Sequence, residues 1–333
     1  MSLATTRFGR TGLTVSRLAL GTMTFGLQTD EATARTILDA AAEGGVNFLD
    51  TADVYPLGGS VETAGATEAI LGRWLRDRGR SRFIVATKAA AKVGPASWDQ
   101  GNSRKHLLDA IDASLGRLQT DHVDLYQLHF DDRQTPLDET LEALDTIVRS
   151  GRARYVGVSN FMAWRIARAI GRSELNRLVR FVSVQPRYSL LFREIERELL
   201  PLAAEEGLAV IPYNPLAGGL LSGKYRPAAG PQENTRFTLG SAGAMYQDRY
   251  WNERCFAAVQ RLQDIAAEAG VGLATLAVAW TMAKPQITAP LLGASRPEQL
   301  AATLAAADYV LDPALEKRLD EETAEFRKGD APR

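Results

Sequence analysis

Residues 47–55 read NFLDTADVY, and this stretch decides how the rest of the chain is interpreted. Phe48 and Leu49 predict the end of a buried strand, and Asp50 and Tyr55 follow where a strand commonly passes into a polar turn. A carboxylate and a phenol at that position are either parts of a plain turn or titratable groups at the rim of a sheet. The neighbouring segments decide between these two interpretations.

The composition limits the classes to which the protein can belong. The chain has 333 residues, 45% of them hydrophobic, and a formal net charge of -1. It is therefore expected to be globular, and no basic field favours nucleic acid or a membrane surface as a partner. No segment reaches the roughly 18 apolar residues of a membrane span, and the start lacks a signal-like apolar run. Cys255 is the only cysteine, which argues against disulfides and cysteine-based metal sites and suits a reducing cytoplasm.

Short apolar runs alternate with helix-period segments along the chain, which is the pattern of a parallel sheet. Helices are predicted at residues 31–45, 103–118 and 136–151. The predicted strands are LALG (18–21), NFLD (47–50), FIVATK (83–88), VDLYQLH (123–129), RYVGVSN (154–160), FVSVQ (181–185), LAVIPYN (208–214) and ITAPLLG (287–293). This pattern predicts an α/β fold, a closed (β/α)8 TIM barrel, as a single domain over residues 1–333. An N-terminal β-hairpin (8–18) is expected to cover its bottom, and a C-terminal helix (311–326) to follow it.

Two nucleotide-binding alternatives lack their motifs. A doubly wound sheet would usually carry a glycine-rich fingerprint after its first strand. GVGLAT at 270–275 lies between two helical segments instead, which is the wrong context. GGLLSGKY at 218–225 nearly matches a P-loop, but Tyr225 stands where a Ser or Thr would hold magnesium. A nucleotide triphosphatase is therefore rejected.

Four titratable residues gather at the predicted rim of the barrel, where catalytic residues of this fold lie. Asp50, Lys88 and His129 end three successive strands, and Tyr55 lies in the loop after the first of them. Neighbouring strands are about 4.8 Å apart, so these side chains can converge within about 10 Å. Each residue alone is more often a rim charge, a structural histidine or a packed ring. All four together are a much less frequent accident.

The chemistry of this combination is proton donation. A phenol has an ordinary pKa of about 10, too high for efficient donation near neutral pH. A neighbouring ammonium would lower that pKa. Asp50 would then hold Lys88 charged and Tyr55 would be the acid. His129 would either orient a substrate carbonyl or share the proton. The other two histidines, His106 on a predicted helix and His122 before the fourth strand, do not lie at the rim with His129. The residues needed for a zinc site or a serine triad are therefore not gathered there.

These segments resemble the aldo-keto reductase family over nearly the whole length. The resemblance is carried by RLALGTMTFG, NFLDTADVY, VATK, VDLYQLH, GVSNF, VQPRYSLL, IPYNPLAGGLLSGKY and LLGASRPEQL. It implies a barrel that binds NADPH without a Rossmann domain. It also implies an NADP(H)-dependent enzyme that reduces an aldehyde or ketone by hydride transfer, with Tyr55 as general acid supported by Asp50, Lys88 and His129. The chain resembles the bacterial branch related to potassium-channel β-subunits and to antibiotic- and deoxysugar-pathway reductases.

The resemblance also implies a cofactor site, carried over position by position. Ser159, Asn160 and Gln185 would bind the nicotinamide carboxamide, and Tyr213 would stack on its ring. Arg296 beside Ser295 suits a 2′-phosphate, which favours NADPH over NADH. The full set of implied cofactor residues is Gly21, Thr22, Met23, Asp50, Ser159, Asn160, Gln185, Tyr213, Asn214, Pro215, Leu216, Gly218, Leu220, Gly223, Lys224, Arg236, Gly293, Ser295, Arg296 and Gln299.

The chain departs from the family pattern in two places. Ala302 and Thr303 stand where the family often has Glu-Asn, so weaker adenine contacts are expected. The loop after Tyr55 is long, as in family members that act on larger metabolites. Two alternatives therefore stand beside a general carbonyl reductase: a reductase of a nucleotide-deoxysugar or polyketide intermediate, and a cofactor-sensing protein like the channel β-subunits. The expected partner is a small-molecule carbonyl substrate, with no metal, and a homo-oligomer is left open.

Overall fold

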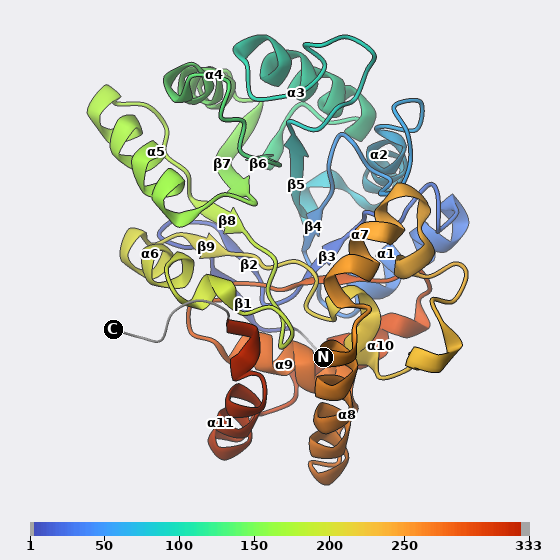
Figure 1. The fold of residues 1–333 in the computed structure, drawn as a ribbon. Helices are drawn as coiled ribbons and strands as arrows, with labels where there is room; N and C mark the ends of the chain where they lie inside the picture. The colour runs from blue at the N-terminus through green and yellow to red at the C-terminus, as the bar shows by residue number, and fades with distance from the viewer. Residues whose placement is uncertain (1–2, 328–333) are drawn as a thin grey trace.

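The computed structural model of the chain describes residues 3–327. Within this range, eight parallel strands form one sheet in the order β10-β3-β4-β5-β6-β7-β8-β9. The N–H groups of Thr288 and Leu291 donate to the carbonyls of Val210 and Pro212, each at 2.8 Å. These bonds join β10 and the residues before it to β9, so the two edges of the sheet meet, and helices surround the strands (Figure 1). The predicted (β/α)8 barrel is confirmed.

The elements follow the predicted order. The barrel strands are β3 (Ala19–Gly21), β4 (Phe48–Asp50), β5 (Ile84–Ala89), β6 (Val123–Leu128), β7 (Ala153–Ser159), β8 (Ser183–Gln185), β9 (Ala209–Val210) and β10 (Leu291–Gly293). The helices are α1 (Glu31–Glu43), α2 (Ala66–Arg78), α3 (Arg104–Leu118), α4 (Leu137–Arg149), α5 (Ala163–Asn176), α6 (Leu199–Glu206), α7 (Gly240–Tyr250), α8 (Glu253–Glu268), α9 (Leu273–Ala283), α10 (Glu298–Leu304) and α11 (Pro313–Glu322). Side chains cap several starts: Ser103 accepts from the His106 N–H before α3, which satisfies a donor that the helix leaves unpaired.

An N-terminal hairpin closes the bottom of the barrel, as predicted. Its strands β1 (Thr5–Arg7) and β2 (Thr14–Ser16) pair antiparallel. Phe8, between them, is fully buried and packs with Phe48 and Ala86 inside the barrel. The rings of Phe8 and Phe48 meet edge to face, 5.7 Å between centroids. This end of the barrel is therefore filled with apolar side chains, and any ligand must enter from the other end.

The barrel wall alternates strictly between an inner and an outer face. On β5, Ala86 belongs to the barrel interior, whereas Val85 and Ala89 belong to the core between strands and helices. Lys88, two residues after Ala86, points inward by the same alternation. The register pairs Ala86 with Leu125 and Lys88 with Gln127 of β6. An apolar layer therefore lies below a polar one, at the ends where the strands finish.

The long excursion after β9 forms the 3-10 turns η3 (Ala217–Ser222) and η5 (Arg236–Thr238) and then α7. Leu239, just before α7, lies close to Gly58 in the loop after β4. Across residues 3–327, no single helix is long and apolar enough to cross a membrane. Only when taken together are α8 and α9 long and apolar enough, and these two helices are bent by 92° relative to each other.

Candidate active site

The structure brings the four predicted catalytic residues together. The Lys88 ammonium is fully buried and donates to Asp50 Oδ2 at 2.5 Å and to the Thr51 carbonyl at 2.8 Å. Its third contact is the Tyr55 hydroxyl, at 3.4 Å. The His129 ring meets the Tyr55 ring edge to face, with centroids 5.8 Å apart. The ends of β4, β5 and β6 therefore place an ion pair, a phenol and an imidazole within contact of one another.

Asp50 is held by two amides in addition to Lys88. The side-chain N–H groups of Gln127 and Gln185 donate to its Oδ1, at 3.0 and 2.8 Å. Sequence reasoning did not single out Gln127. The signal was present, because Gln127 precedes His129 by two residues and side chains two apart on a strand share a face. The three donors, Lys88, Gln127 and Gln185, fix the position of the Asp50 carboxylate, and Asp50 in turn fixes Lys88.

For Lys88 and for Tyr55, burial and the neighbouring charges have opposite effects on the pKa. Burial acts to lower the pKa of Lys88, but Asp50 and Tyr55 outweigh it, and the pKa ends above its ordinary value. Burial raises the pKa of Tyr55, and this outweighs the opposing effect of Lys88. Lys88 does act to lower the Tyr55 pKa, as expected, but the expected net decrease is wrong, because burial has the larger effect. The phenol keeps its proton at neutral pH.

His129 is neutral. Burial, with a smaller effect from Lys88, lowers its pKa well below the ordinary value. Its ring stacks on Phe130 with centroids 4.5 Å apart and planes 6° from parallel, while its backbone N–H donates to the Ala89 carbonyl at 2.8 Å. The imidazole is thereby fixed in orientation, and an uncharged imidazole can donate one hydrogen bond to a ligand oxygen.

The residues implied for the nicotinamide end form one hydrogen-bonded chain. The Tyr213 hydroxyl donates to Asn160 Oδ1 at 2.8 Å, and Asn160 Nδ2 donates to the His129 carbonyl at 3.0 Å. The Ser159 hydroxyl donates to the Gln185 carbonyl at 2.9 Å. Thr22 is buried, and its hydroxyl donates to the Asp50 carbonyl at 3.0 Å. These hydrogen bonds hold the side chains in place beside the catalytic four.

Three basic residues are implied to bind the phosphates of the cofactor. Lys224, Arg236 and Arg296 have no ion pair with any residue in the described range 3–327. Arg236 follows the η3 loop, and one of its guanidinium nitrogens is buried without a hydrogen-bond partner. Burial and the neighbouring Arg296 lower the pKa of Lys224. Unpaired cations with a buried free donor fit the phosphates of a dinucleotide, because guanidinium and ammonium groups bind phosphate oxygens.

The backbone of the η3 loop leaves no room for larger residues. Gly218 and Gly223 have positive φ angles of 70° and 74°. A Cβ on Gly218 would lie 2.9 Å from the Tyr246 ring. The loop is also fixed by Asn214, whose Oδ1 accepts from the Gly218 N–H at 2.6 Å and whose Nδ2 donates to the Tyr250 hydroxyl at 3.0 Å. The glycines therefore serve a tight fold of the loop, whatever they bind.

The implied adenosine end has fewer free side-chain groups. Gln299 Oε1 accepts from the Ser295 N–H at 2.9 Å. Thr303 is buried, and its hydroxyl donates to the Leu300 carbonyl at 3.0 Å. Ala302 is exposed and has no polar side chain. Neither position therefore offers a free polar side-chain group at this end. The remaining implied positions, Gly21, Met23, Pro215, Leu216, Leu220 and Gly293, lie at the same strand ends or in the same loop.

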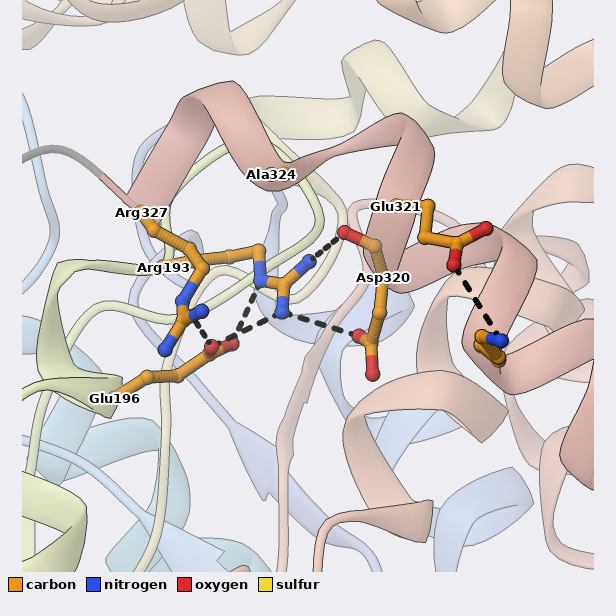
Figure 2. A pocket seen from close by; sticks show the side chains of 7 residues that line it. Arg193, Glu196, Asp320, Glu321, Ala324 and Arg327 are labelled. Carbon is orange, nitrogen blue, oxygen red and sulfur yellow. Dashed lines mark hydrogen bonds and ion pairs between the residues drawn. The ribbon is translucent and has the colours of Figure 1, made fainter. Parts of the chain in front are cut away.

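A hollow of about 410 Å³ lies apart from this site, against α11 (Figure 2). Arg193 donates to Glu196 Oε1 at 2.7 Å and lies 3.1 Å from Asp320 Oδ1. Lys284 lies 2.8 Å from Asp320 Oδ2, and Arg327 lies 3.1 Å from Glu196 Oε2. We call Arg193, Glu196, Lys284, Asp320 and Arg327 the C-terminal brace. Its charges satisfy one another, so it binds the last helix to the barrel.

Comparison with known proteins identifies the family of the chain. Residues 17–323 match the aldo/keto reductase family. The chain is 40% identical to uncharacterized oxidoreductase YrpG of Bacillus subtilis, over 95% of this chain and 94% of that protein. It is 36% identical to a probable voltage-gated potassium channel subunit beta of Arabidopsis thaliana, over 91% and 90% of the two chains. It is 30% identical to versiconal hemiacetal acetate reductase of Aspergillus parasiticus, over 92% and 93%.

The matched region covers all eight barrel strands and the four residues at their rim. The resemblance of the sequence to a family, including its channel-subunit branch, is therefore confirmed. The chain belongs to the aldo/keto reductase family, and it is an oxidoreductase that acts on carbonyl compounds.

Proposed function

We propose that the protein reduces an aldehyde or ketone to an alcohol with NADPH, and that Tyr55 donates the proton. The observation that carries this proposal is the buried Lys88, 2.5 Å from Asp50 and 3.4 Å from the Tyr55 hydroxyl. Among the described residues, the Tyr55 phenol is the only group in contact with this ammonium that carries an acidic proton. Its raised pKa keeps it in the donating form at neutral pH.

Each of the four residues has a separate task in this proposal. The cofactor, when bound, supplies the hydride. Tyr55 gives its proton to the carbonyl oxygen as negative charge develops there, and Lys88 stabilises the phenolate left behind. Asp50 keeps Lys88 charged and in place. His129, neutral and held against Phe130, donates a hydrogen bond to the same oxygen and orients the carbonyl toward Tyr55.

NADPH is proposed over NADH because of the charge at the far end of the site. The family generally uses NAD(P)H. Burial and the nearby Arg296 lower the pKa of Lys224, and Arg236 keeps a buried nitrogen free. Two adjacent cations without carboxylate partners repel each other, and a bound phosphate relieves that repulsion. NADPH carries one more phosphate than NADH.

The test is Tyr55→Phe, with Tyr309→Phe as a control because Tyr309 lies between α10 and α11, outside the strand ends. Binding of NADPH and NADH is followed by cofactor fluorescence, and turnover by cofactor oxidation with aldehydes, ketones and keto-sugars. Loss of a positioned general acid reduces turnover by about 10² to 10⁴-fold. We expect that loss in Tyr55→Phe only, with NADPH binding unchanged in both variants. Wild-type turnover by Tyr55→Phe would remove Tyr55 from the role of acid.

The same substrate panel distinguishes two narrower functions. Similarity to the Aspergillus reductase supports a larger substrate of secondary metabolism, for which keto-sugars and polycyclic carbonyls would be the best substrates. Similarity to the plant channel subunit supports a cofactor-sensing role. That role would show as tight NADPH binding with no turnover across the panel.

A further inference from the structure

A second buried charge cluster lies on the outer face of β5, directly behind the catalytic four. Thr87 precedes Lys88 and points outward, where its hydroxyl donates to Glu68 Oε1 at 2.5 Å. Glu68, on α2, is fully buried. Its Oε2 accepts from Arg117 of α3, at 2.7 Å. The Arg117 side chain passes directly over Gly65, where a Cβ would lie only 2.4 Å from it.

Asp53 joins these two clusters and is paired in neither. It is 1% exposed, and neither of its carboxyl oxygens has a hydrogen-bond partner within residues 3–327. Its backbone N–H donates to the Lys88 carbonyl at 3.0 Å. It therefore links the end of β5 to the loop that carries Tyr55, only two residues further on.

The two cations near Asp53 are each paired with another carboxylate. Lys88 is paired with Asp50, and Arg117 is paired with Glu68. The groups that act on Asp53 are Glu68 from α2, Arg117 from α3, Lys88 from β5 and the nearby backbone N–H of Val54. Tyr126 of β6 also lies in its field, and its hydroxyl donates to the Leu107 carbonyl. A third carboxylate here would be a buried charge without a counterion, which proteins avoid by protonation.

We propose that Asp53 is a positioning residue that stays protonated behind the catalytic four, and that loss of this proton in alkaline solution weakens Tyr55 as the acid. Burial, followed by the charge of Glu68, raises the pKa of Asp53 well above its ordinary value. Once ionised, Asp53 would offset the field of Lys88 that stabilises the Tyr55 phenolate. This inference rests on the proposed function for its catalytic part, but not for the protonation itself.

The first experiment needs neither substrate nor cofactor: urea unfolding of wild type, Asp53→Asn and Asp109→Asn from acidic to alkaline pH. The folded protein holds the Asp53 proton to higher pH than the unfolded chain does, so wild-type stability falls as pH rises above about 3.9, the ordinary value. Asn mimics the protonated carboxyl and has no such slope. We expect Asp53→Asn to be more stable than wild type at neutral pH, with the gain vanishing on acidification.

Asp109 is the matched control, because it lies exposed on α3. Asp109→Asn should keep the wild-type slope. If Asp53→Asn keeps it too, or is less stable than wild type at neutral pH, Asp53 is ionised in the folded protein and the proposal is wrong.

The second experiment tests the positioning role through the pH dependence of kcat. Wild-type turnover should fall by up to about tenfold per pH unit once Asp53 ionises, and this fall should move to higher pH in Asp53→Asn. Ionisation of Tyr55, followed by tyrosinate absorbance against Tyr55→Phe, should occur at lower pH in Asp53→Asn than in wild type. This readout does not depend on turnover, so it separates failure of this inference from failure of the proposed function. Coincident profiles would overturn the positioning role even if the stability slope is found.

Discussion

The catalytic four and the C-terminal brace are both clusters of opposite charges, but they differ in what their cations contact. In the brace, Arg193 and Lys284 pair with carboxylates, and the neutral side chain to which Arg193 also donates is the Thr323 hydroxyl, an alcohol. The brace borders a hollow of about 410 Å³ (Figure 2). In the catalytic cluster, Lys88 contacts one carboxylate, the Thr51 carbonyl and a phenol, which is an acid. The size of a hollow is thus a poor guide to function here. A buried cation beside an uncharged acid is the better one.

Lys88→Met breaks the catalytic cluster and should have the largest effect. Removing one partner of a buried ion pair costs about 3–5 kcal/mol of folding stability, because the other charge is left without a counterion. Asp50 retains Gln127 and Gln185 as donors, so we expect the lower end of that range. Turnover should be lost together with stability, since Tyr55 loses the charge that stabilises its phenolate.

Urea unfolding and cofactor oxidation per folded molecule measure the two effects separately. The control is Lys105→Met, at an exposed pair with Asp109 on α3, where little change in either quantity is expected. Turnover near the wild-type rate in folded Lys88→Met would contradict the comparison, because the catalytic cluster would then be structural like the brace.

Arg193→Met breaks the brace and should affect stability alone. Arg193 donates to Glu196, to the Asp320 carbonyl and to the Thr323 hydroxyl. Glu196 keeps Arg327 and Tyr188 as partners, so no charge is left isolated. Hydrogen bonds to charged groups contribute about 1.5–3 kcal/mol each when a partner is lost, and we expect a loss in this range.

The measurement is again urea unfolding, with turnover per folded molecule beside it. Arg193→Lys, which keeps the charge but not the forked geometry, should recover part of the stability. A drop of turnover in correctly folded Arg193→Met would show that the brace communicates with the catalytic site, and the separation drawn here would fail.

The sequence was sufficient to predict the barrel and its catalytic rim, for a physical reason. Strand alternation and helix period are local, and strand ends in a barrel meet on one side, so Asp50, Lys88 and His129 could be placed together before any coordinates. The hairpin that contains Phe8 was likewise predicted, because its pattern stood before the first strand.

Long-range pairing could not be predicted in the same way. Nothing local says that Glu68 meets Arg117, or that Arg193 meets Asp320, 127 residues away. The direction of the Tyr55 pKa was also missed, since it depends on how completely the surrounding chain excludes water from the phenol. Asp53 is the clearest case: as part of DTADVY it looked like a turn residue, and only its burial without partners reveals its difference from Asp50.

The smallest expected effect is the absence of a histidine ionisation from the pH dependence of turnover. Burial and Lys88 lower the pKa of His129 well below its ordinary value, which is about 6.5. Turnover should therefore not change across weakly acidic to neutral solution, where an exposed histidine would gain a proton. Stability should behave differently: because the unfolded chain binds this proton more readily, the contribution of His129 is present above about 6.5 and is lost as pH falls through that value. His129→Asn, which keeps a neutral donor, should remove that acid slope while its turnover stays independent of pH in the same window. A histidine-like midpoint in wild-type turnover that disappears in His129→Asn would mean that Lys88 and burial do not keep this ring neutral, and that the catalytic cluster tolerates a second cation as the brace does.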